Sequence, residues 1–171
     1  MKPFELNNRT YGFLNPFIIA EIGVNHEGSL DSAIGMIEQV GEAGGHAVKF
    51  QTYSADKLAT KDSSPAYWDT SKETIRSQHE LFQKWSSFTP QDYLKLADVA
   101  KNCGLVFMST PFDLEAVEML DPLVPAFKIA SADITNIPLI RLVGSKGKPV
   151  IVSVGAANFS EIQIALDELS K

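Results

Sequence analysis

Two lysines inside short apolar runs carry the chemistry that this sequence can offer. Lys128 lies within residues 126–133, and Lys49 lies within residues 47–51. Removing an ammonium group from water is costly unless an anion pairs with it or its pKa shifts. One such lysine alone is best explained as an edge-strand residue that reaches water. Two lysines in matching contexts instead predict one anionic ligand held between strand ends.

Polar side chains mark the ends of five apolar runs. In chain order they are Glu21, then Lys49 and Gln51, then Ser109 and Thr110, then Lys128 and Ser131, and last Ser153. Two ammonium groups, several hydroxyls and an amide suit a ligand with a phosphate and a carboxylate. Glu21 and Asp133 are left as candidate acid or base groups, or as neighbours of a metal.

Strands and helices are predicted to alternate along most of the chain. Strands are expected at residues 17–23, 47–50, 105–109, 126–133 and 149–153, and helices at 29–44, 73–85, 89–103, 113–120, 136–143 and 160–169. Thr89, followed by a proline and by Asp92, has the pattern of a helix N-cap. Ser160 is the expected cap of the last helix. Residues 52–88 otherwise lose the pattern, as functional loops often do.

Alternation of this kind implies parallel strands joined by right-handed crossovers. A (β/α)₈ barrel and an open doubly wound sheet both satisfy it. The sequence has no Gly-x-Gly-x-x-Gly after its first strand, which weakens the nucleotide-binding sheet. Polar groups at five strand ends favour the barrel, because barrel enzymes place their chemistry at the C-terminal ends of many strands.

Composition excludes several classes of protein. The chain has 171 residues, of which 44% are hydrophobic, enough for the core of one domain. A net charge of −6 argues against nucleic acid as a partner. Cys103 is the single cysteine, so neither an internal disulfide nor a cysteine-rich metal site is expected. No apolar run is long enough to span a membrane, and the N-terminus lacks a signal-peptide core, so a cytoplasmic location is the default expectation.

Four stretches of the chain closely resemble the sialic acid synthase (NeuB-like) family. They are IAEIGVNHEG at 19–28, VKFQT at 48–52, STPFD at 109–113 and FKIAS at 127–131, with a looser match at PVIVSVG, 149–155. They occur in the family's order and cover nearly the whole chain.

The resemblance implies a transferase that condenses phosphoenolpyruvate with an N-acylated amino sugar, N-acetylmannosamine or its 6-phosphate, and releases phosphate. It implies that phosphoenolpyruvate is held by Lys49, Lys128, Ser131 and Ser153, and that Gln51, Thr110 and Phe112 line the sugar side. It further implies that Glu21 lies near a metal-bound water. Asp133 stands where many members carry a glutamate that is proposed to act as an acid or base. The aspartate side chain is one methylene shorter.

The resemblance also implies parts that this sequence lacks. Only about five of eight β/α units are predicted, so residues 1–171 are expected to form an incomplete barrel domain without the family's C-terminal antifreeze-like (SAF) domain. A divalent metal, Mn²⁺ or Mg²⁺, is expected for the full-length enzyme, but His26, His46 and His79 match none of its ligands. The full-length relatives are expected to be homodimers. The chain is therefore predicted to be a fragment without synthase activity of its own.

Two other functions remain open at this level. One is a class I aldolase or lyase of the barrel type, in which Lys128 forms a Schiff base with a carbonyl substrate. The other is a non-catalytic remnant that binds a sugar acid. The presence of Lys49, Gln51, Lys128, Ser131 and Ser153 together argues against the remnant, because such a protein has no need of the full anion-binding set.

Overall fold

The computed structural model describes residues 3–6, 9–62, 65–86 and 88–171. Five strands follow one another, and each leads into a helix on the way to the next. The strands are β3 (Ile19–Gly23), β4 (Ala47–Thr52), β5 (Val106–Pro111), β6 (Phe127–Ile129) and β7 (Val150–Val152). The helices are α1 (Leu30–Glu42), α4 (Pro90–Asn102), α5 (Leu114–Leu120), α6 (Ile137–Ser145) and α7 (Phe159–Leu169).

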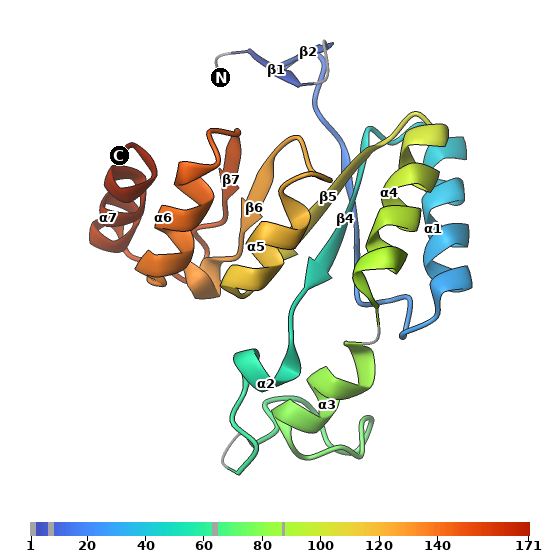
Figure 1. Cartoon of the computed structure of the whole chain (residues 1–171), viewed down its shortest axis with the longest axis vertical. Helices are drawn as coiled ribbons and strands as arrows, with labels where there is room; N and C mark the ends of the chain where they lie inside the picture. Colours follow the sequence, from blue (N-terminus) through green and yellow to red (C-terminus); the bar gives the residue numbers. More distant parts are fainter. Residues whose placement is uncertain (1–2, 7–8, 63–64, 87) are drawn as a thin grey trace.

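The strands are arranged as in a (β/α)₈ barrel. β3 pairs with β4, β4 with β5, and β6 with β7, in every case in parallel, and β6 lies next to β5. Figure 1 shows β4 to β7 side by side with the helices along them. The predicted α/β fold of barrel type, with five units, is confirmed.

Side chains alternate between two separate apolar clusters on the two faces of the strands. Val48 and Phe50 of β4 pack with residues of the helices in one cluster, which is therefore the outer layer. Ala47 of β4 packs with Val106 and Met108 of β5 in a second cluster that contains no helix residue, which is the inner layer. Lys49 has the same parity as Ala47, so the strand geometry directs it inward.

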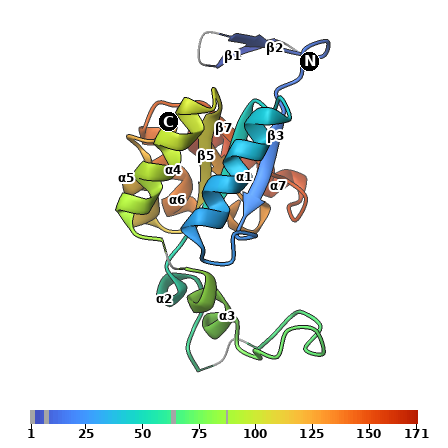
Figure 2. The same cartoon turned by 90° about the vertical axis from the view of Figure 1, so that its right-hand side faces the viewer.

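A short hairpin lies at the end of the strands opposite α2 (Ala55–Leu58) and α3 (Gln78–Trp85), as Figures 1 and 2 show. Its strands, β1 (Phe4–Leu6) and β2 (Arg9–Tyr11), pair antiparallel. Leu6 and Tyr11 are buried in the inner cluster. The hairpin thus covers the N-terminal ends of the strands. The sequence did not indicate this hairpin.

Five helices begin within one residue of the predicted starts. Ser29, Thr89, Asp113 and Asn136 each accept a backbone N–H of the first turn, and Thr89 forms the full capping box with Asp92. The predicted cap at Ser160 is wrong. The cap lies two residues earlier, at Asn158, which forms a reciprocal capping box with Glu161, and α7 begins at Phe159.

Two further predictions need correction. The helix expected at residues 73–85 begins only at Gln78, since Ser77 caps it, and Trp68 donates its indole N–H to the carbonyl of Ile75 in the preceding extended segment. The lysine strand ends at Ile129, and residues Ser131–Asp133 form a 3₁₀ turn. Within the described residues, no helix has the length and hydropathy needed to cross a membrane.

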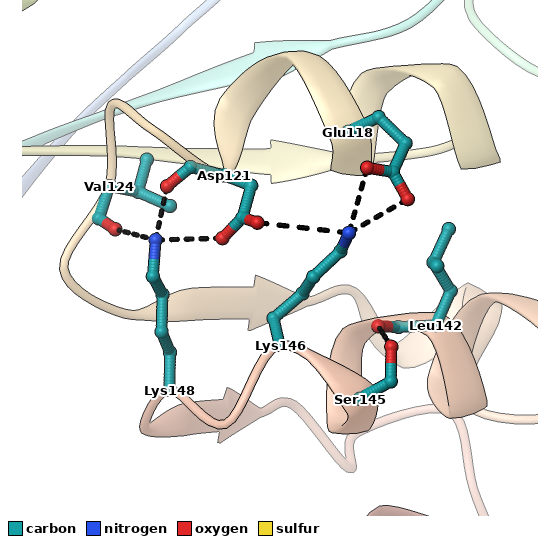
Figure 3. Close-up of polar contacts among 7 residues, drawn as sticks. All are labelled: Glu118, Asp121, Val124, Leu142, Ser145, Lys146 and Lys148. Carbon is teal, nitrogen blue, oxygen red and sulfur yellow. Dashed lines mark hydrogen bonds and ion pairs between the residues drawn. The ribbon is translucent and has the colours of Figure 1, made fainter.

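A group of lysine contacts fastens the turn after α5 to the turn after α6 (Figure 3). Lys148 donates to the carbonyls of Val124 and Asp121 and lies 2.8 Å from the Asp121 carboxylate. Lys146 contacts Asp121 and binds both oxygens of Glu118 at 2.7 Å. Because β6 and β7 begin immediately after these turns, the contacts fix where the two strands start.

Replacing Lys148 by methionine is expected to destabilise the chain by about 1–3 kcal/mol, because charge-assisted hydrogen bonds to two carbonyls are lost while the apolar stem is kept. Urea denaturation followed by circular dichroism measures the change. Lys171→Met is the matched control, because Lys171 forms only an exposed pair with Glu168 and should stay within about 0.5 kcal/mol of the parent. Equal effects of the two substitutions would contradict the role given to Lys148.

Candidate functional site

The strand register gathers four of the predicted site residues at the C-terminal ends of β3, β4 and β5. Glu21 is the cross-strand partner of Lys49, and Gln51 is the partner of Thr110. The Lys49 Nζ lies 2.5 Å from Glu21 Oε2 and donates to Thr110 Oγ1 at 3.1 Å. Lys49 is thus a nearly buried cation with one anionic and one hydroxyl partner.

Lys128, like Lys49, forms a hydrogen bond with a hydroxyl group at the end of the neighbouring strand. Its Nζ donates to Ser153 Oγ at 2.6 Å and to the Ile129 carbonyl at 2.8 Å. Burial lowers the pKa of Lys128, the positive charge of Lys49 lowers it further, and the charge of Glu21 opposes the shift. The charges of Lys49 and Glu21 therefore both act on Lys128. That the two lysines share one ligand site stays a prediction.

The pair of Lys49 and Glu21 is asymmetric in its exposure. The Lys49 side chain is 10% exposed, whereas that of Glu21 is 51% exposed. The carboxylate can therefore turn toward water when another anion takes its place, at a modest cost. The ammonium has no such freedom, since the strands enclose it. An incoming anion would therefore displace Glu21 and pair with Lys49 in its place.

Asp133 stands apart from these charges. It is partly buried on the 3₁₀ turn after β6, and its Oδ2 is buried without a hydrogen-bond partner among the described residues. Burial alone raises the pKa of Asp133. The carboxyl group therefore favours its protonated form more than an ordinary aspartate does. Neither Asp133 nor Ser131 has a described contact with Lys49 or Lys128.

Gly23 is a site residue that the sequence reasoning did not single out. Its φ is +57°, a left-handed conformation that favours glycine, and it ends β3 two residues after Glu21. A Cβ at this position would lie 3.2 Å from Glu21 Oε1 and 3.5 Å from Gln51 Nε2. The glycine thus makes room between a carboxylate and an amide of the site. A glycine two residues after a glutamate at a strand end was the sequence feature that could have identified Gly23.

Asp113 joins the loops that follow β4 and β5. It begins the helix predicted at residues 113–120, and its Oδ1 accepts the N–H of Ala116. Its Oδ2 also accepts the N–H of Ser54, in the loop after β4. Phe112 donates its N–H to the Thr52 carbonyl across the same gap. Asp113 therefore helps to set the spacing of the segments that carry Gln51 and Phe112.

Ser109 and His26 are both buried on the outer side of the strands. The Ser109 hydroxyl lies 2.7 Å from that of Thr52, so it does not join the lysines. The His26 ring stacks on Phe88 with centroids 4.3 Å apart, and burial lowers the pKa of His26. It also lines a cavity of about 190 Å³ beside Gln51, between the starts of α4 and α5.

The remaining histidines lie elsewhere. His79 binds Asp56 at 2.7 Å between α2 and α3, and His46 accepts the N–H of Ile18 near the hairpin. In the described ranges, no three His, Cys, Asp or Glu side chains gather closely enough to hold a metal ion. The residues present thus do not form the ligand set of the divalent metal that the resemblance implies.

Comparison with known proteins matches residues 36–171 to the model of the NeuB family. The chain is 38% identical over 153 residues to an N,N'-diacetyllegionaminic acid synthase of Legionella pneumophila, covering 88% of this chain and 43% of that protein. It is 36% identical over 159 residues to the human N-acetylneuraminate-9-phosphate synthase, covering 90% and 44%.

A solved structure shows the same arrangement of the chain. It is an N-acetylneuraminic acid synthetase from Leptospira borgpetersenii in complex with citrate, with a TM-score of 0.84 and 33% identity. The match covers 99% of this chain and 55% of that one. The chain spans about half the length of the proteins it matches.

Proposed function

This chain belongs to the NeuB family, and from that premise we propose that it forms the phosphoenolpyruvate-binding part of a nonulosonic acid synthase. The observation that most supports this proposal is the pair of ammonium groups of Lys49 and Lys128, which point inward at the C-terminal ends of the strands. The charge of Lys49 contributes to the lowered pKa of Lys128. Phosphoenolpyruvate carries a phosphate and a carboxylate, and two cations with adjoining hydroxyls suit those two anionic groups.

In the proposed complex, Lys128 and Ser153 bind as one unit, since they are already hydrogen-bonded. Lys49 exchanges Glu21 for an anionic group of the substrate and keeps Thr110 as a partner. Ser131 follows β6 and would add a hydroxyl donor. Gln51, near the end of β4, and Phe112, just after β5, would face the amino sugar. Holding both substrates in this way lowers the barrier by orientation.

The proposed reaction forms a carbon–carbon bond and hydrolyses an enol phosphate. C3 of phosphoenolpyruvate attacks the aldehyde carbon of the open-chain sugar, and the aldehyde oxygen takes up a proton. Water then adds at C2 and loses a proton, and cleavage of the C2–O bond releases phosphate. The cations stabilise the developing alkoxide and the leaving phosphate.

Two carboxyl groups of this chain are proposed to move protons. Burial raises the pKa of Asp133, which suits a general acid. Glu21, once displaced from Lys49, is an exposed carboxylate that can accept a proton from water. A divalent metal, when bound, would polarise the aldehyde, but no step here is assigned to it, because the described residues do not supply its ligands.

We propose that residues 1–171 make up an incomplete NeuB-like barrel domain. The proposal rests on the five β/α units and on the share of its relatives that the chain covers. The whole protein would act on small molecules, in the cytoplasm, as a homodimer. The 171-residue chain by itself is expected to give no condensation product with phosphoenolpyruvate, N-acetylmannosamine and Mn²⁺, and product formation would contradict this.

Calorimetric titration of the folded 171-residue chain with phosphoenolpyruvate tests the proposal. Saturable binding is expected, and Lys128→Met should lose it. A folded chain that shows no binding would overturn the proposed site. Incubation with pyruvate and borohydride is the second arm, because a Schiff-base aldolase would become irreversibly labelled at Lys128. No covalent label is expected, and a label that Lys128→Met removes would favour the aldolase instead.

A further inference from the structure

A second pocket lies at the opposite end of the strands, between the hairpin and the end of α4. Its volume is about 210 Å³, and it is lined by Arg9, Tyr11, His46, Lys101 and residues Gly104, Leu105 and Val106. Its polar side chains come from β2, from the turn before β4 and from the last turn of α4. We call it the basal pocket. It shares no residue with the site around Lys49 and Lys128.

The basal pocket gathers cations and has no acidic lining residue. Within the described part of the chain, neither Arg9 nor Lys101 forms an ion pair, although the net charge of −6 offers many carboxylates. Arg141, by contrast, is paired with Glu168. Two unmatched cations on a concave surface attract an anion.

His46 adds a directed hydrogen-bond donor. Its Nδ1 accepts the backbone N–H of Ile18 at 3.1 Å, so the ring proton must lie on Nε2 when the imidazole is neutral. The ring packs against Tyr11 with centroids 5.3 Å apart. The imidazole is therefore held by a hydrogen bond and by ring packing, and no described residue forms a hydrogen bond with Nε2. Fixed donors bind an anion at a lower entropic cost than mobile ones.

The helix dipole is the alternative explanation for Lys101, which lies in the last turn of α4. However, the carbonyls there already have backbone partners. The N–H groups of Cys103, Gly104 and Leu105 bind the carbonyls of Val99, Lys101 and Ala100. The dipole also gives no reason for Arg9, which comes from a different element. The convergence of Arg9, His46 and Lys101 is better explained by a shared ligand.

We propose that the basal pocket binds a small anion bearing a phosphate group, at a site separate from the catalytic one. Arg9 and Lys101 would supply charge, and His46 Nε2 and the Tyr11 hydroxyl would supply hydrogen bonds. Inorganic phosphate and a phosphorylated metabolite share this chemistry. The pocket's small volume suits either a free phosphate or the phosphate end of a larger molecule. The proposal does not depend on the reaction proposed above.

Titration calorimetry with inorganic phosphate tests the basal pocket, with Lys128→Met as the parent so that binding between the two lysines is weakened. Arg9→Gln with Lys101→Gln should weaken phosphate binding at least tenfold. Arg9 and Lys101 are exposed, so the control is a pair of equally exposed cations outside the pocket: Lys72→Gln with Lys95→Gln removes the same charge and should leave phosphate binding unchanged. Equal affinity in the two double variants would overturn the proposal, as would the absence of phosphate binding to the folded parent.

A second ligand, glucosamine 6-phosphate, separates the two sources of the phosphate group. Tighter binding than that of inorganic phosphate, lost in the Arg9 and Lys101 variant, would assign the pocket to a phosphorylated metabolite. Equal or weaker binding would assign it to free phosphate. The variant Arg9→Gln with Lys101→Gln in the otherwise native chain should still bind phosphoenolpyruvate saturably. A failure of the basal-pocket proposal can therefore be distinguished from a failure of the proposed phosphoenolpyruvate site.

Discussion

Replacing Lys49 by methionine is expected to weaken phosphoenolpyruvate binding by at least about a hundredfold, or roughly 3 kcal/mol. Two losses add up. The substrate loses a nearly buried ammonium group, and Glu21, which lies 2.5 Å from that group in the native chain, is left as an unpaired carboxylate beside it. A carboxylate facing an anionic substrate in a partly dry site repels it. Calorimetric titration of the 171-residue chain measures the effect.

The double variant Lys49→Met with Glu21→Gln separates the two losses. It should bind phosphoenolpyruvate more tightly than Lys49→Met alone, because the repelling charge is gone. Glu21→Gln alone should bind at least as well as the native chain, since the substrate no longer competes for Lys49. Lys171→Met, which removes an exposed cation paired with Glu168 after α7, is the control and should have little effect. A Glu21→Gln chain that binds far more weakly would show that the carboxylate holds Lys49 in place rather than competing for it.

Asp133→Asn is expected to stabilise the chain at neutral pH by on the order of 1 kcal/mol, seen as a rise in Tm of about 2–4 °C. The buried Oδ2 lacks a hydrogen-bond partner in the described chain, so the ionised form is costly. The amide occupies nearly the same volume and carries no charge. A substitution at a proposed catalytic residue that improves stability is typical of sites whose groups are held in unfavourable surroundings.

The effect should depend on pH in a definite direction. Burial raises the pKa of Asp133 in the folded chain above that of the unfolded chain. The folded state therefore binds more protons between the two pKa values, and stability falls as pH rises through that interval. Above it, the full penalty of the ionised group is present. The gain from Asp133→Asn should thus be largest at neutral pH and disappear below the ordinary pKa of aspartate.

Thermal melts at several pH values measure this difference. Asp98→Asn, at an exposed position, is the control and should show no such trend. A pH-independent difference for Asp133→Asn would mean that its charge is already compensated. In the full-length protein, the catalytic proposal would be wrong if Asp133→Glu and Asp133→Ala both left turnover unchanged.

Local signals predicted the helices well because caps act within a few residues of sequence. Thr89 with Asp92 specifies one helix start completely. The last helix shows the limit of such reasoning, since Asn158 and Ser160 are both suitable caps. Asn158 has Glu161 three residues later and Ser160 has Gln163, so both fit a capping box and the pattern alone did not decide between them. The structure uses the pair of Asn158 and Glu161. The hairpin was not readable, because three-residue strands leave too little periodicity to detect.

The candidate site was predicted as a set of residues but not as a network. The alternation of strands indicated that Lys49 and Lys128 would meet at one end of the barrel. The pairing of Lys49 with Glu21 depends on the register of β3 and β4, which no local pattern specifies and which shifts only after Glu21. The second contact of Asp113, with the loop after β4, was equally out of reach because it joins segments 59 residues apart.

The strict alternation of inner and outer side chains along β4 has a consequence for how the length of this sequence can change in evolution. One inserted or deleted residue within the strand would turn Lys49 into the outer layer and Phe50 into the inner one. Segments outside the strands carry no such parity. Gaps in an alignment of related sequences should therefore be confined to connections such as residues 53–77, while the spacing from Ala47 to Thr52 stays constant.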